Sequence, residues 1–147
     1  MFTAELKEIF IRELDMLEEE INAYSDESGL WAVKSEIKNS AGNLCLHLNG
    51  NLQHFIGAVL GKTGYVRNRD AEFADRNIPR SRLIELIHIS KKVINETLNQ
   101  LTDENLVSNY PLQVFGKEMT TRFFLTHLAT HLTYHLGQVN YHRRLIG

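Results

Sequence analysis

Apolar residues recur at every third or fourth position in four long stretches of the chain, which is the spacing of one face of an α-helix. These stretches predict helices over residues 3–24, 40–60, 81–101 and 120–145. The apolar positions at the start of the chain are Phe2, Leu6, Ile9, Phe10, Leu14, Leu17 and Ile21. Apolar residues cover much of the circumference of the second stretch, so we expect that helix to be the most deeply buried.

Several residues indicate where these helices begin and end. Gly61 follows the second apolar stretch in the manner of a glycine C-cap, Pro79 suits the first turn of the third helix, and Thr120 can serve as N-cap of the fourth. Residues 65–78 are charged and aperiodic, and we predict an ordered loop there. In the later connection, residues 112–115 could form one short extended piece.

Four helices of about twenty residues each make an all-α four-helix bundle the expected architecture. A chain of 147 residues with 43% hydrophobic residues can bury one core but is short for two domains. We therefore predict a single domain over residues 1–147. The two long connections argue against a simple up-down-up-down order with tight loops.

Charge and cysteine content narrow the classes of function. The net charge of -2 argues against a nucleic acid partner, because proteins that bind phosphates usually carry a basic face. Cys45 is the only cysteine, which excludes an intrachain disulfide and predicts a buried, inert thiol. The chain has no run of about 18 uncharged apolar residues and no signal-like N-terminal segment. We expect a soluble, cytoplasmic protein without membrane contact.

Three histidines, His127, His131 and His135, stand at intervals of four on the last predicted helix. Residues four apart lie on neighbouring turns of one helix face, so their imidazoles can converge on one point. This is the spacing of metal ligands. The glutamate that accompanies such a pair in zinc hydrolases is missing here.

A second polar line runs along the otherwise apolar second helix, at Asn43, His47, Asn51 and His54. A buried polar group without a partner costs roughly 1–3 kcal/mol, and a metal would give His47 its partner. One imidazole from this helix and two from the last helix would hold a divalent ion with positions open for water or substrate. That arrangement is typical of a catalytic metal site.

The motifs on these two helices resemble those of a known superfamily. Residues 46–52 (Leu-His-Leu-Asn-Gly-Asn-Leu) and 131–138 (His-Leu-Thr-Tyr-His-Leu-Gly-Gln) resemble the DinB-like (YfiT-like) superfamily of metal-binding four-helix bundles. Residues 64–73 resemble a segment of an uncharacterised branch of it, and the resemblance spans the whole chain. It implies an up-down-down-up bundle that is often a homodimer. The metal ligands that it implies are His47, His131 and His135.

Other polar residues have more than one interpretation. The resemblance places an extra, usually non-ligating histidine at His127, which would hydrogen-bond behind the ligands or close one side of the pocket. His54 lies about 10 Å along the helix axis from His47, which suits a pocket rim. Asn51 could orient a ligand or touch substrate, or pair with a backbone carbonyl. His142 lies in the last helical turn, where a capping role is favoured.

Arg67, Arg69, Asp70 and Glu72 form a run of charge that in most proteins is a solvated surface. Phe73 could anchor the segment, so the alternative is an ordered ion-pair network that shapes the mouth of the pocket or a subunit contact. The residues alone leave both interpretations open.

A divalent ion held by three imidazoles can make water or a substrate thiol nucleophilic at neutral pH. Some members of the superfamily use low-molecular-weight thiols, so the resemblance implies a metal-dependent thiol S-transferase or hydrolase with a small electrophilic substrate. Nickel or zinc is expected, and iron or manganese are alternatives. No general base stands out in the sequence. A non-catalytic, structural or stress-related dimeric metal binder, or an accidental surface stripe of histidines, are the other interpretations.

Overall fold

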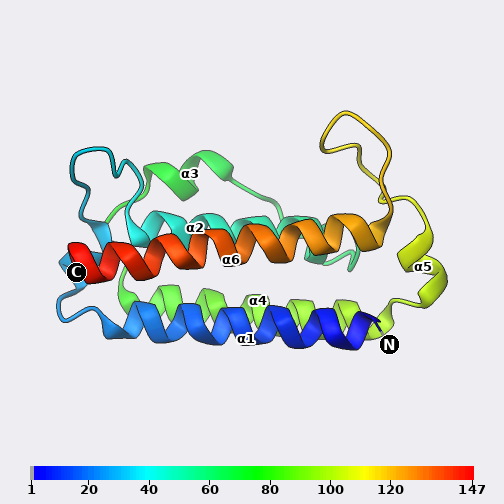
Figure 1. Cartoon of the computed structure of the whole chain (residues 1–147), viewed down its shortest axis with the longest axis horizontal. Coiled ribbons are helices and arrows are strands. Elements are labelled where there is room, and N and C mark those ends of the chain that lie inside the picture. Colours follow the sequence, from blue (N-terminus) through cyan, green and yellow to red (C-terminus); the bar gives the residue numbers. More distant parts are fainter. Residues whose placement is uncertain (1) are drawn as a thin grey trace.

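The computed structural model describes residues 2–147, and its long helices lie side by side (Figure 1). The long elements are α1 (Phe2–Ala23), α2 (Ala41–Leu52) with its π-helical continuation η2 (Gln53–Ala58), α4 (Arg80–Gln100) and α6 (Thr121–Leu145). The short ones are the 3₁₀-helix η1 (Glu27–Trp31), α3 (Arg69–Ala74) and α5 (Asp103–Val107). The described residues form no strand, only isolated bridges, so the prediction of an all-α fold is confirmed.

The four long helical stretches pack around a shared interior. α1 contacts α4 and α6, and α2 contacts the same two helices from the other side. In Figure 1, α1 and α6 run in one direction and α2 and α4 in the opposite one, while α3 lies against the outer side of α2. This arrangement places α2 beside α6, so their facing side chains can meet.

The interior is built from the apolar positions that the helical spacing predicted. Phe10, Leu14, Leu17 and Ile21 of α1 are fully buried, and removing each such side chain from water contributes roughly 1.5–3 kcal/mol. Every residue of α2 except Leu46 is buried, as expected for the helix with apolar residues around most of its circumference. Its buried residues include polar ones, and these need partners.

The end of the second helical stretch differs from the prediction. The helix continues with π-type hydrogen bonds, in which the Val59 amide donates to the His54 carbonyl. Gly61 is not the left-handed cap: that conformation belongs to Lys62, with φ of 53°. Gly61 is instead required by packing, because a Cβ there would lie 2.5 Å from Oγ1 of Thr97.

The two connections contain short helices that periodicity did not predict. Residues 65–78, expected as a loop, include α3, whose N-cap Asn68 accepts a hydrogen bond from the Ala71 amide. Residues 112–115 form a bend and a turn, so the expected extended piece is wrong. Thr120 caps α6 as predicted, accepting from the Phe123 amide. None of the helices in the described part of the chain is long and apolar enough to span a membrane.

Candidate metal centre

Three histidines from two helices meet where α2 packs against α6. The ring of His47 on α2 lies 5.1 Å from that of His131 and 5.3 Å from that of His135, both on α6. The two α6 rings are 4.6 Å apart, as four-residue spacing on one helix allows. One ligand atom from each lies within 4.8 Å of the others. The predicted convergence of His47, His131 and His135 is therefore confirmed, and the three could hold a metal ion.

The closest pair of nitrogens has the separation of two ligands on one cation. Nε2 of His47 lies 3.3 Å from Nε2 of His131. Two nitrogens bound at ~2.0 Å to one tetrahedral zinc ion are about 3.3 Å apart. The ligand atoms of the three histidines all lie within 4.8 Å of one another, so closing them onto one ion needs shifts of at most on the order of an ångström or two. The trio fits a divalent ion with small side-chain adjustments.

Burial keeps the α6 imidazoles neutral, as metal ligands must be. Burial and the neighbouring histidines lower the pKa of His131 to about 4, and burial also lowers the pKa of His135. His47 is 6% exposed, whereas His131 and His135 are half-buried. The site is therefore closed on its α2 side and reachable by solvent along α6.

The three rings differ in what their remaining nitrogens contact. Nδ1 of His135 lies 2.6 Å from Oε1 of Gln138. Nδ1 of His131 is buried and has no hydrogen-bond partner among the described residues. Nδ1 of His47 lies 3.0 Å from Oε1 of Glu72, so only His47 contacts a carboxylate.

Glu72 contacts a candidate ligand, although the sequence indicated it only as a member of the charged run and did not link it to His47. It is 5% exposed and binds Arg67 through both oxygens, with Nε and Nη2 each at 2.9 Å. Burial alone would raise the pKa of Glu72, but hydrogen bonds from His47 and Arg67 outweigh burial and lower it. The ion-pair interpretation of the charged segment is confirmed for Arg67 and Glu72, and their pair lies against a metal-ligand candidate.

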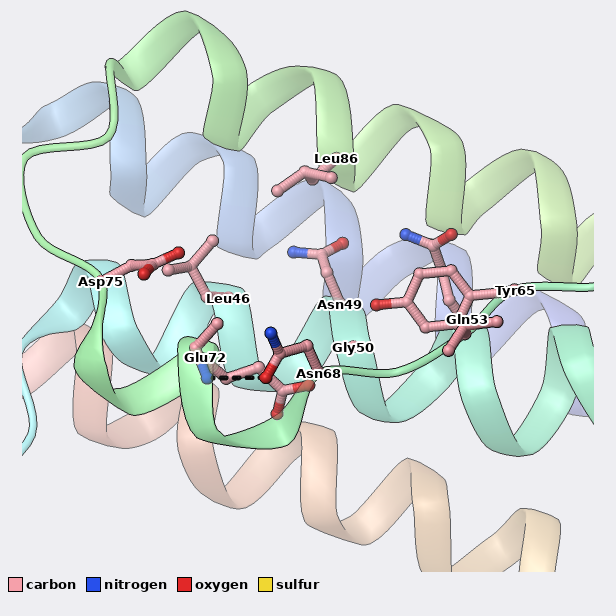
Figure 2. Close-up of a pocket in the computed structure, with 11 residues that line it drawn as sticks. Leu46, Asn49, Gly50, Gln53, Tyr65, Asn68, Glu72, Asp75 and Leu86 are labelled. Carbon is pink, nitrogen blue, oxygen red and sulfur yellow. Dashed lines mark hydrogen bonds between the residues drawn. The ribbon is translucent and has the colours of Figure 1, made fainter.

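Two residues of α2 fix the position of Glu72. The side-chain amide of Asn43 donates to the backbone carbonyls of Glu72 and Asp75, each at 2.9 Å. Glu72 reaches from α3 toward Gly50 of α2 (Figure 2). A Cβ at Gly50 would lie only 1.9 Å from Oε2 of Glu72, so the carboxylate occupies the space of the missing side chain.

The family model described as "Protein of unknown function (DUF1572)" matches residues 1–147. The chain belongs to this family. No curated protein matches the chain. The DUF1572 description names no activity, so the DinB-like relationship expected from the motifs stays a prediction.

Three other candidate residues of this DUF1572 protein, His127, Asn51 and His54, are not part of the converging trio. The ring of His127 lies 6.2 Å from that of His131 and packs against Phe115 at 4.7 Å. Asn51 is buried, and its Oδ1 has no partner in the described part of the chain. The ring of His54 is 4.7 Å from that of Phe55. The pocket roles suggested for His127, Asn51 and His54 stay predictions.

His142 differs from its expected capping role. It is 3% exposed, its Nδ1 lies 2.6 Å from the Tyr24 hydroxyl, and its Nε2 lies 2.8 Å from the Ala32 carbonyl. The carbonyl can only accept, so Nε2 donates to it and Nδ1 accepts from Tyr24. His142 thus joins α6 to Tyr24, the residue after α1, and to Ala32, the residue after η1. Its ring is buried by these contacts and does not cap the end of α6.

A cleft of about 190 Å³ lies beside Glu72 between α2, α4 and the 65–75 segment (Figure 2). Polar side chains of Asn49, Gln53 and Tyr65 line it, but the three histidines do not. Glu72 lines this cleft and also contacts Nδ1 of His47, so it lies between the cleft and the histidine trio.

Proposed function

We propose that the protein binds one divalent metal ion through His47, His131 and His135. The observation that carries this proposal is the 3.3 Å separation of the facing Nε2 atoms of His47 and His131. Without a cation, two facing imidazole nitrogens can share only one proton, so at most one of them can donate to the other. Neutral imidazoles favour zinc or nickel, with iron or manganese as alternatives.

The metal centre supports a DinB-like assignment with an up-down-down-up bundle. Support comes from the helix directions in Figure 1 and from the pairing of one α2 histidine with two α6 histidines. With this assignment we propose a single domain, a cytoplasmic location and a homodimer.

The activity we propose is that of a metal-dependent thiol S-transferase or hydrolase. A divalent cation held at this site would supply Lewis acidity, which lowers the pKa of water or of a low-molecular-weight thiol. The chain contributes a buried His47 that closes the α2 side. The half-buried His131 and His135 leave an approach for a small electrophilic substrate along α6.

A non-catalytic metal-binding bundle is the second candidate, and one observation favours it. The principal clefts of the described residues are lined by residues other than the three histidines. A metal that holds α2 to α6 without a substrate cavity would contribute its binding free energy to folding.

Metal analysis of purified protein tests the site. We expect about one equivalent of zinc or nickel in the wild type, and loss of most of it in His47→Ala and His131→Ala. The control is His88→Ala, because His88 is exposed and bonded to Glu18 on α1. Unchanged metal content in both site variants would end the proposal.

The two candidates differ in their response to chelation. For an enzyme, we expect removal of the metal to abolish thiol consumption with small electrophiles and added metal to restore it. For a structural site, the wild type consumes no thiol in either state, and the melting temperature falls strongly after chelation. Thiol consumption that chelation leaves unchanged would contradict the enzymatic proposal.

A further inference from the structure

The Nδ1 atom of His47 faces a buried carboxylate that is itself held by a guanidinium. Glu72 Oε1 lies 3.0 Å from His47 Nδ1, and Arg67 binds both Glu72 oxygens at 2.9 Å. We propose that Glu72, oriented by Arg67, is a positioning residue that keeps Nδ1 of His47 protonated and presents the Nε2 lone pair to the metal. This inference rests on the proposed metal site.

The hydrogen-bond donors and acceptors around His47 determine its tautomer. A carboxylate only accepts, so a short contact with Nδ1 requires a proton on that nitrogen. Nη2 of Arg67 is also near Nδ1, but at 3.4 Å, and it already donates to Glu72 Oε1 at 2.9 Å. The shorter, charge-assisted bond from Nδ1 to Glu72 is the stronger one. In the neutral ring that a metal ligand must be, Nε2 is then the unprotonated nitrogen, and it faces His131.

The carboxylate is fixed by its surroundings and has little freedom to leave His47. Gly50 provides the space that Oε2 occupies, and Asn43 holds the backbone of Glu72. The side chain of Glu72 is 6% exposed and that of Arg67 is 13% exposed, so both charges are largely out of water. A charge buried to this degree is costly unless its partners stay in place.

The other two histidines lack an equivalent support. The Nδ1 of His135 contacts the neutral amide of Gln138, which is exposed. The Nδ1 of His131 has no partner in the described part of the chain. A carboxylate behind an imidazole fixes the ring and increases its donor strength. His47 is therefore the preorganised ligand, to which His131 and His135 adjust.

Titration of metal-free protein with zinc or nickel, by calorimetry with a competing chelator, tests the inference. We expect Glu72→Gln to weaken the Kd by about 10–100-fold. Arg67→Ala keeps the Glu72 carboxylate but removes the guanidinium that orients it, so we expect metal binding to weaken several-fold. This second variant also decides the outcome if Glu72→Gln does not fold.

Matched controls separate positioning from general stabilisation. Glu13 is as buried as Glu72, at 5%, and is paired with Arg12 on α1, so Glu13→Gln should lower the metal-free melting temperature without changing the Kd. Arg69 lies over the Phe73 ring rather than on Glu72, and Arg69→Ala should also keep the wild-type Kd.

The possible results distinguish this inference from the metal site on which it rests. A wild-type Kd in Glu72→Gln and Arg67→Ala, with metal lost in His47→Ala, would overturn the positioning role and leave the site standing. A wild type that takes up neither metal would overturn both proposals. A weakened Kd in the Glu72 and Arg67 variants, with both controls unchanged, supports the inference.

Discussion

At the scale of single residues, the absence of a side chain at Gly50 is as important as the side chains that surround it. A glycine inside a helix costs about 0.5–1 kcal/mol relative to alanine. Here the missing Cβ leaves room for a carboxylate oxygen that would otherwise be 1.9 Å away. The backbone of α2 and the side chain of Glu72 therefore approach each other only because position 50 is glycine.

We expect Gly50→Ala to destabilise the protein by about 1–3 kcal/mol, because the added methyl group must displace Glu72 or the helix. Metal affinity should fall with it, since the bond from His47 to Glu72 would be lost. Gly137→Ala is the control: this glycine lies inside α6, and a Cβ added to it would meet nothing within 4 Å, so the variant should gain up to about 1 kcal/mol. Urea unfolding measures both. Equal stability of the two variants would contradict the packing argument.

At the scale of elements, α3 depends on the rest of the molecule for its existence. A helix of six residues is too short to be stable in isolation. Its N-cap Asn68 provides one local bond, and Asn43 of α2 provides two bonds to the backbone at 2.9 Å. The polar residue at position 43 thus anchors the segment that carries Glu72.

We expect Asn43→Ala to release α3 from α2, because the buried Glu72 carbonyl loses its donor at a cost of about 1–3 kcal/mol. The Asp75 carbonyl also loses its bond to Asn43, but it still accepts from Arg76. Hydrogen exchange should accelerate in residues 69–74 while the core of α1 stays protected. The comparison is Asn105→Ala, which removes the side-chain half of the exposed capping box of α5, the bond that Asn105 Oδ1 accepts from the Thr102 amide. This variant should accelerate exchange only in α5. Unchanged exchange in α3 after the Asn43 substitution would show that other contacts hold it.

At the scale of the whole molecule, the first and last helices are joined by polar contacts as well as by the core. Glu20 of α1 binds Arg143 and Asn140 of α6, and Tyr24 binds His142. Burial would raise the pKa of Glu20, but its hydrogen bonds to Arg143 and Asn140 lower it. The charged form of Glu20 therefore stabilises the folded state.

The sign of this pKa shift predicts the pH dependence of stability. A carboxyl whose folded pKa lies below its unfolded pKa stabilises fully above the unfolded value, and the contribution is lost as pH falls through the folded value. We expect Glu20→Gln to lower the unfolding free energy by about 0.5–1 kcal/mol at pH 7 and by less at pH 3. Glu8→Gln, at an exposed position of the same helix, should show no such difference. An equal loss at both pH values would contradict the argument.

Most of the helical framework could be predicted because helical periodicity is a local property. The residues on the buried face of a helix are three and four positions apart in the sequence, so their apolar character can be seen there directly. The four predicted helices correspond to α1, α2 with η2, α4 and α6. The pair His131 and His135 was predictable for the same reason. His47 needed one further argument, that a polar residue on a buried helix must have a partner.

The amino-acid sequence by itself thus determined the all-α class, the buried faces and the candidate ligands. Only the tertiary structure decided that Glu72, 25 residues from His47, contacts its Nδ1, and that His142 binds Tyr24 across 118 residues. Neither contact produces a periodic pattern in the sequence, because each depends on how two separate segments pack against each other. The charged residues 67–72 have the same sequence whether they are solvated or bonded to a buried imidazole. Only the packing of α3 against α2 takes Glu72 out of water and places it beside His47.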